Sequence, residues 1–161
     1  MSFASPTLGT LARHLIELLD GEVEAAYAAS GLEWRPRYTP VLRALMSLGS
    51  GCIKALAVEI GISHSAVSQT VSQMTRDGLV VLKPGADARE RIVVLTSKTE
   101  TLIPALQRQW AATNAAADQL DAELSVPLTG VLGEAIAALN QHPFAERITA
   151  AAATLDPSEH P

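Results

Sequence analysis

The sequence predicts a mainly α-helical chain with one small sheet of two to three β-strands. Three observations in residues 52–95 support this prediction. Two short amphipathic helices are joined at a single glycine, Gly61. A second glycine, Gly78, ends the helical pattern. Two apolar runs follow, residues 79–83 and 92–95, with a polar loop between them that is typical of a hairpin. Helix, turn, helix and hairpin in this order form a winged helix-turn-helix, a module that places one helix in the DNA major groove.

The chain before this module is predicted to form two helices. Ser5-Pro6 reads as a cap followed by proline at the first helical position. The first helix ends near Ser30-Gly31, and a second one starts at Thr39-Pro40 and stops at Gly49. The apolar face of the first helix comprises Leu8, Leu11, Leu15, Leu18, Leu19, Val23 and Ala26.

Small residues at fixed positions predict the helix-turn-helix itself, over residues 52–60 and 63–76. Ala57 is placed at the helix crossing, where a larger side chain would push the helices apart. Gly61 supplies the positive φ that the tight turn requires. Val67 packs back onto the first helix, and Ser63 is a good N-cap for the second. An ordinary helix pair could show the same spacing, but the strand-loop-strand that follows favours the winged module.

The chain after the hairpin is predicted to be helical as well. Ser97-Lys-Thr-Glu100 has the pattern of a capping box. Further helices are expected near residues 126–140 and 144–155. The helix after the capping box repeats apolar residues at spacings of three and four, as coiled coils do, at Ile103, Leu106, Trp110, Thr113, Ala117, Leu120 and Leu124.

These terminal helices carry more apolar surface than the winged module can cover. Pairing with a second copy of the chain is the expected way to bury it. We therefore predict an N-terminal dimerisation helix in residues 1–36, a DNA-binding lobe in residues 37–96, C-terminal dimerisation helices in residues 97–155 and a tail in residues 156–161. A monomeric helical bundle is the competing interpretation.

The outward face of the second helix of the module carries side chains suited to DNA. Short hydroxyls and amides can approach base edges and phosphates, and glutamine can pair with adenine through two hydrogen bonds. A solvated polar face would contain the same residue types, so no single residue decides between the two interpretations. The candidate DNA-binding residues on this helix are Ser63, His64, Ser65, Ser68, Gln69, Ser72, Gln73 and Arg76.

The hairpin adds basic side chains to this surface. Lys83, Arg89 and Arg91 are candidates for contact with the minor groove and its phosphates, where the potential is most negative. Asp87 would repel phosphate. We expect it instead to support the hairpin by holding one of the arginines through a charge-assisted hydrogen bond.

The hairpin also carries a family resemblance. Asp87-Ala-Arg-Glu-Arg-Ile-Val-Val-Leu-Thr96, preceded by Gly78-Leu-Val80, resembles the wing signature of the MarR family of bacterial transcription regulators. Over the rest of residues 8–140 the match is one of pattern only. The resemblance implies a sequence-specific regulator, with repression favoured, that binds a pseudo-palindromic operator as a homodimer. The chain departs from the family at Thr99, often glycine, and at Cys52, usually a Ser or Thr cap.

A short segment between the first two helices is a candidate effector site. Trp34, Arg35, Arg37 and Tyr38 place two aromatics and two arginines in five residues of a chain that is 4% aromatic. The resembled family often binds small aromatic or anionic molecules near this position. Stacking on the aromatics, pairing with an arginine and a hydrogen bond from His14 would suit such a ligand. A packing corner with solvated arginines is the competing and simpler interpretation.

Composition bounds the remaining functions. Residues 52–95 hold five basic and four acidic residues, a net charge of +1. Because the whole chain has a net charge of −5, the remaining residues together carry −6. DNA binding should therefore depend on a local basic rim. No apolar run is long enough to span a membrane and the start lacks signal-peptide features, so we expect a cytoplasmic protein. Catalytic motifs, cofactor fingerprints and metal-ligand spacings are not found in the sequence, so we expect no enzyme and no cofactor.

Two alternatives stay open at this stage. Cys52 is the single cysteine, and a regulator that senses oxidants through it is one alternative. No second cysteine could resolve a sulfenate within the chain, so a structural role is favoured. The other alternative is a winged helix used only for protein contacts. Such modules tend to lose the basic wing residues that this chain retains.

Overall fold

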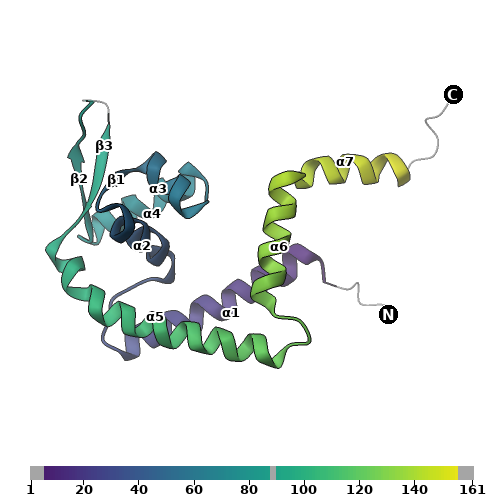
Figure 1. The fold of residues 1–161 in the computed structure, drawn as a ribbon, viewed down its shortest axis with the longest axis horizontal. Helices are drawn as coiled ribbons and strands as arrows, with labels where there is room; N and C mark the ends of the chain where they lie inside the picture. Colours follow the sequence, from purple (N-terminus) through teal and green to yellow (C-terminus); the bar gives the residue numbers. More distant parts are fainter. Residues whose placement is uncertain (1–5, 88–89, 156–161) are drawn as a thin grey trace. The chain divides into compact units, whose positions relative to one another are not determined.

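The structure, a computed structural model, describes residues 6–87 and 90–155. The chain divides into two compact units, residues 1–111 and 112–161, which are described separately. The predicted fold class is confirmed: helices predominate and the sheet has three short strands (Figure 1). The elements are α1 (Leu8–Ala29), the 3₁₀ helix η1 (Pro36–Tyr38), α2 (Thr39–Leu48), β1 (Gly51–Cys52), α3 (Ile53–Ile60), α4 (His64–Arg76), β2 (Val80–Pro84), β3 (Arg91–Leu95), α5 (Ser97–Glu123), α6 (Leu128–Gln141) and α7 (Phe144–Leu155).

The helix-turn-helix forms as the spacing of small residues predicts. Gly61 ends α3 in the left-handed region with φ of +76°, which glycine adopts at little cost. Ser63 caps α4, and its Oγ accepts a hydrogen bond from the amide of Ala66 at 3.2 Å. Val67 is fully buried and Ala57 nearly so. The close packing of α3 on α4 fixes the direction in which the outer face of α4 points.

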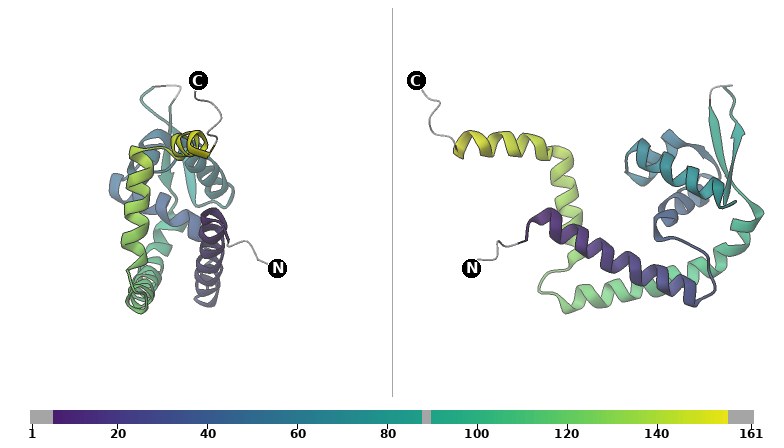
Figure 2. Two further views of the ribbon diagram at one scale, coloured as in Figure 1. Left: turned by 90° about the vertical axis from the view of Figure 1, so that its right-hand side faces the viewer. Right: turned by 180° about the vertical axis from the view of Figure 1, so that it is seen from behind.

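The sheet is antiparallel with strand order β1-β3-β2. Val80 pairs with Leu95 and Pro84 with Arg91, so β2 and β3 form the predicted hairpin. Gly51 and Cys52 pair with Val93 and Ile92 as the short third strand. Val80 and Val93 are fully buried, which anchors the base of the hairpin in the core. Its far end extends beyond the helices of the lobe in each view (Figures 1 and 2).

A chain of polar contacts joins three helices in the core of the first unit. The Trp34 indole donates to Thr39 Oγ1 at 3.1 Å, and the Tyr27 hydroxyl lies 3.3 Å from the same oxygen. The Trp110 indole donates to the Tyr27 hydroxyl at 3.0 Å. Large aromatic side chains are thus packed with their polar atoms paired, as buried tryptophan and tyrosine require. These bonds fix the end of α1 and the first half of α5 against α2.

Two helix starts differ from the sequence-based predictions. The helix α1 begins at Leu8 with Thr7 as its cap, so the predicted Ser5-Pro6 start is wrong; Pro6 precedes the helix and Ser5 lies outside the described residues. The predicted capping box at Ser97 is also wrong. The hydroxyl of Thr96 accepts from the Thr99 amide at 3.4 Å and donates to the Gly78 carbonyl at 2.8 Å. Thr7 and Thr96 are the caps because their hydroxyls have hydrogen-bonding partners in the fold, although other residues match the sequence pattern of a cap better.

Thr99 explains the departure from the resembled family at its position. Its side chain is fully buried, and its hydroxyl donates to the carbonyl of Leu79 at 2.6 Å. A buried hydroxyl is stable only with such a partner. Thr99 therefore ties the start of α5 to the entry into β2.

The second unit comprises the end of α5 together with α6 and α7. Asp121 Oδ1 accepts from the amides of Leu128 and Thr129 at 2.7 and 3.2 Å, so a carboxylate from α5 caps α6. The Arg147 guanidinium donates to the carbonyls of Ala138 and His142, both at 3.1 Å. Within residues 112–155 no side chain is buried. The large apolar side chains left exposed on α6 and α7 are Val131, Leu132, Ile136, Leu139, Phe144, Ile148 and Leu155.

Taken singly, none of the described helices has both the length and the apolar character that a bilayer crossing needs. The helices α5 and α6 meet the length and composition criteria only jointly, as a bent pair.

Candidate nucleic-acid interface

The outer face of α4 is a polar strip at the surface of the first unit. Gln69, Ser72 and Arg76 are exposed, while Ser68 and Gln73 are half-buried. Together with Arg37 from η1, these side chains line a shallow groove of about 380 Å³. The structure therefore brings together five of the predicted DNA-binding residues. The hydroxyls and amides in this groove could donate to or accept from base edges, and the two arginines could meet phosphates.

The N-terminal turn of α4 holds the other three candidates. His64 and Ser65 are exposed, as is the cap residue Ser63. The side-chain oxygen of Ser63 already accepts from Ala66, so its main task is to begin the helix. Unpaired amides at a helix N-terminus favour an anionic group nearby, which a phosphate could supply.

The C-terminal turn of α4 is organised around Asp77. Its Oδ2 accepts from the Tyr38 hydroxyl at 2.6 Å and its Oδ1 from the Gln73 amide at 2.9 Å. The Gln73 oxygen in turn accepts from Arg76 Nη2 at 2.5 Å. The hydrogen bond from Tyr38 is the largest cause that holds the pKa of Asp77 below its ordinary value. Burial is the main cause that raises the pKa of Tyr38, so the phenol stays protonated and can donate.

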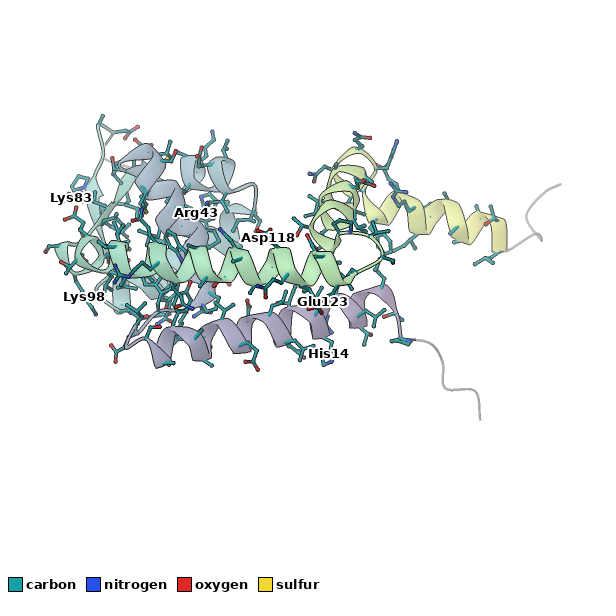
Figure 3. The ribbon with its side chains drawn as sticks, turned by 60° about the horizontal axis from the view of Figure 1, so that its bottom comes forward. His14, Arg43, Lys83, Lys98, Asp118 and Glu123 are labelled. Atoms are coloured by element: carbon teal, nitrogen blue, oxygen red, sulfur yellow. The ribbon has the colours of Figure 1, made fainter. Side chains whose placement is uncertain are left out.

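The hairpin carries basic side chains on both strands. Lys83 on β2 and Arg91 on β3 are exposed and lie one register position apart in the ladder (Figure 3 labels Lys83). At the turn the Asp87 carbonyl accepts from the Glu90 amide at 2.9 Å. Arg89, predicted to contact DNA, lies outside the described residues. The role of Asp87 as an arginine partner stays a prediction.

A larger cleft of about 740 Å³ lies beside the predicted effector segment. Trp34, Arg35 and Tyr38 line it, as do Asp77 and Lys98. Trp34 and Tyr38 are only 3% and 1% exposed, because both rings belong to the core and pack edge to face with centroids 5.6 Å apart. They therefore offer the cleft an edge rather than a free stacking face. Two acids, Glu24 and Glu33, complete the polar part of the lining.

The structure separates the remaining effector candidates from this cleft. His14 lies in the N-terminal half of α1, and Figure 3 shows it far from Lys98, which lies at the start of α5. Its imidazole is exposed, with Glu17 Oε2 3.9 Å away. Arg37 lines the α4 groove instead, with its guanidinium carbon 5.6 Å from the centroid of the Tyr38 ring. The tight turn at Pro36 directs Arg35 and Arg37 into different hollows, which their spacing alone does not reveal.

Sequence reasoning missed Asp77 and Lys98. Lys98 Nζ donates to the Asp77 carbonyl at 3.1 Å, which places a positive charge at the mouth of the cleft and at the C-terminus of α4. An acid at a helix C-terminus opposes the helix dipole, and this was the available sequence signal that Asp77 has a specific partner.

Cys52 lies at the start of α3 and is half-buried as a free thiol. It occupies the cap position without a side-chain cap bond, and its backbone belongs to β1. In the described part of the chain, no group of three or more His, Cys, Asp or Glu side chains is placed to hold a metal ion.

Comparison with known proteins places this fold. No family model matches the chain, and no curated protein matches its sequence. Among solved structures it is similar to the transcriptional regulator MosR of M. tuberculosis in complex with DNA, with 26% identity and a TM-score of 0.65 over 87% of this chain and 98% of that one. It is also similar to the regulator PcaV of Streptomyces coelicolor with its natural ligand (22% identity, TM-score 0.58, 87% and 99% covered). A third similar structure is Bordetella bronchiseptica BpsR, whose DNA binding 6-hydroxynicotinic acid regulates (19%, 0.51, 70% and 83%).

The chain has the fold of a MarR-like winged-helix regulator. The resemblance seen in the wing sequence is thereby confirmed at the level of the fold. In this MarR-like fold, α4 is the second helix of the helix-turn-helix and β2–β3 is the wing. The comparisons are with transcriptional regulators rather than with enzymes.

Proposed function

We propose that this chain is a DNA-binding transcriptional regulator that acts as a homodimer. In this proposal α4 of each copy enters a major groove and the wing reaches over the adjacent minor groove. The observation that carries it is the groove on α4, where hydroxyl and amide side chains are bordered by Arg37 and Arg76. The similarity to a regulator solved with DNA, at 26% identity, supports the same function.

The side chains in the groove divide into two kinds. Gln69 is exposed at the middle of α4 and is the best candidate to read a base through two hydrogen bonds. Arg37, Arg76, Lys83 and Arg91 are suited to phosphates, because guanidinium and ammonium groups supply the sequence-independent part of DNA affinity. In this proposal Arg37 therefore contacts DNA rather than the effector.

A second copy is the proposed partner of the terminal helices. The exposed apolar side chains of α6 and α7 have no intrachain cover within residues 112–155. A twofold dimer would bury them and present two α4 helices to half-sites about 34 Å apart, one turn of the duplex. The expected operator is therefore pseudo-palindromic.

We propose a binding function for the 740 Å³ cleft as well: it takes a small aromatic anion that changes DNA affinity. Arg35 and Lys98 would have to pair directly with the anionic group, because Glu24, Glu33 and Asp77 in the same lining outnumber them, and the rings of Trp34 and Tyr38 give apolar edges. One similar structure, BpsR, is regulated by 6-hydroxynicotinic acid and supports a ligand of this class; a second, PcaV, was solved with its natural ligand and supports ligand binding in general. The function proposed is binding rather than catalysis. The redox alternative through Cys52 and the protein-contact alternative gain no support from these comparisons.

The test is a binding titration with duplexes from the protein's own upstream region and with random duplex, at two salt concentrations. Gln69→Ala should cost about 1–3 kcal/mol on the preferred duplex and little on random DNA. Arg37→Ala should weaken binding to both and reduce the salt slope by about 1. Arg108→Ala, which removes an exposed positive charge on α5, is the matched control and should leave the slope unchanged. A wild-type chain that binds no duplex at low salt contradicts the proposal.

A further inference from the structure

The acid at the end of α4 is unfavourable by itself. A carboxylate at a helix C-terminus lies against the negative end of the helix dipole. In the proposed complex it would also stand near DNA phosphates, with Arg76 as its chain neighbour. Asp77 nevertheless occupies this position with both carboxylate oxygens accepting hydrogen bonds. Asp77 is thus disfavoured by both the helix dipole and the nearby phosphates, and yet it is fully hydrogen-bonded. Such a conflict with local rules indicates a specific function for the residue.

Its hydrogen bonds determine the orientation of the Gln73 amide. A charged carboxylate only accepts, so Gln73 must turn its NH₂ group toward Asp77. A guanidinium only donates, so the Gln73 oxygen must face Arg76. Both ends of the amide are then engaged, and one orientation satisfies both neighbours. Gln73 cannot offer adenine a donor and an acceptor together without breaking this arrangement.

The same chain of bonds reaches from the core to the surface. Tyr38 is 1% exposed and cannot follow a moving helix end, so it provides a fixed anchor for Asp77. Asp77 holds Gln73, and Gln73 holds the exposed guanidinium of Arg76. A long arginine side chain loses much rotamer freedom when it binds a phosphate. An arginine already held in place loses less at that step.

We propose that Asp77 is a positioning residue for DNA binding: anchored by Tyr38, it fixes Gln73 as a support for Arg76, which makes the contact with DNA. Gln69, one turn earlier, is then the base-reading glutamine of α4. This inference rests on the proposed function, since it concerns how the DNA-facing groove is set before DNA arrives.

The sign of one substitution separates this role from simple electrostatics. Asp77→Asn removes a negative charge, and charge alone predicts tighter DNA binding. The positioning role predicts weaker binding, because a neutral Asn can keep its oxygen toward Gln73 only by turning its NH₂ toward the Tyr38 hydroxyl, and both contacts lose the strength that the carboxylate charge gives them. We expect affinity to fall by about three- to tenfold, the factor that corresponds to one net hydrogen bond. Glu59→Gln, which removes an exposed acid on α3, is the matched control and should bind DNA equally or more tightly.

A double-mutant cycle supplies a readout that a general structural defect would not give. Arg76→Ala should weaken binding, and adding Asp77→Asn or Gln73→Ala to it should cost nothing further. Tyr38→Phe keeps the ring in the core and removes only the anchoring hydroxyl, so it should show part of the Asp77→Asn loss. It also serves if Asp77→Asn does not fold.

The outcomes are distinguishable from failure of the proposed function. If the wild-type chain binds no duplex, the proposed function fails and the inference falls with it. If the wild-type chain binds and Asp77→Asn binds as tightly or more tightly, the positioning role alone is overturned. Additive losses in the cycle overturn it as well. A loss on Gln73→Ala confined to one base of the preferred duplex would make Gln73 a base reader and refute the assignment.

Discussion

The middle of the chain folds on itself, whereas its two ends bury almost nothing. Every buried apolar side chain in the described residues lies between Tyr27 and Leu106. Residues 8–26 and 112–155 contain none, although they are rich in leucine, isoleucine and alanine. Apolar surface left in water is costly, at roughly 25 cal/mol per Å². The difference teaches that residues 27–106 supply their own core, while the terminal helices would gain theirs from the second copy proposed above.

The difference has a functional consequence. A lobe with its own core can present α4 and the wing as one surface, because Val71 of α4 and Val80 and Val93 of the hairpin are buried in the same core cluster. The distance between two such lobes would be set only by the helices that pair two copies. In this arrangement the lobe makes the contacts with DNA and the terminal helices set the distance between two lobes. A change in one region should therefore impair its own task and leave the other intact.

The largest effect is expected from breaking the pairing of the ends. Leu132 and Ile136 are one turn apart on α6 and are 44% and 60% exposed. Changing both to Asp should convert a dimer to a monomer of 16.9 kDa, visible by light scattering. Affinity for the operator should fall by about 100-fold or more, since each lobe then binds one half-site alone. Glu134→Ala on the same helix should leave the mass unchanged. A double variant that stays dimeric would refute the assignment of α6 to the interface.

The next largest effect is expected in the core of the lobe, the region that folds on itself. Leu56 and Val58 both lie on α3, with Leu56 fully buried and Val58 78% exposed. Leu56→Ala should lower the free energy of unfolding by about 2–5 kcal/mol, because it leaves a cavity in the core. Val58→Ala should change it by less than about 0.5 kcal/mol. Urea unfolding measures both, and equal losses would show that α3 packs differently from the structure described.

The same contrast explains what the sequence could predict. Ala57, Gly61 and Val67 obey local rules of helix crossing and turn geometry, so the helix-turn-helix was predicted closely. The bounds of α2, α4 and α7 were also predicted closely. The strands followed from β-branched runs. Helix caps were harder, since Thr96 and Asp121 act through partners distant in sequence or on another helix.

The candidate site was predictable only in part, for a related reason. Which side of α4 faces outward follows from helical period, and this gave the outer-face residues that are proposed to meet DNA. Whether an arginine next to Pro36 points to α4 or to the cleft depends on tertiary packing, so Arg35 and Arg37 were grouped together. Asp77 gained its role from Tyr38, 39 positions earlier in the chain, and no local pattern connects the two.

A smaller effect is expected at the cleft, where Lys98 in the cleft and Arg37 in the α4 groove give a matched pair of cationic side chains. Lys98→Ala should weaken the binding of salicylate, an aromatic carboxylate, as measured by tryptophan fluorescence. Arg37→Ala should leave salicylate binding unchanged and weaken DNA binding, because Arg37 lines the α4 groove. In the wild-type chain salicylate should reduce operator affinity by a coupling of about 1–3 kcal/mol. If Arg37→Ala abolishes salicylate binding, or salicylate leaves operator affinity unchanged, the cleft is not the effector site.

The smallest effect tests the cap that begins α6, within the region without a buried core. Hydrogen bonds from Thr129 and Leu128 hold the pKa of Asp121 below its ordinary value. A carboxyl with a lowered folded-state pKa stabilises the fold above its unfolded-state pKa. This contribution is lost as pH falls from about 4 through the lowered pKa. Asp121→Asn keeps an acceptor oxygen but does not titrate, so the difference in melting temperature between wild type and variant should shrink over this window.

Asp118→Asn, an exposed acid on the same helix, is the control for general charge effects on melting. If both variants show the same pH dependence relative to wild type, Asp121 has no specific capping role. If only Asp121→Asn differs, α6 depends on a carboxylate from α5 for its start. The orientation of its apolar face would then be fixed before a second copy arrives, which would connect a single hydrogen-bonded cap to the spacing of two DNA-binding lobes.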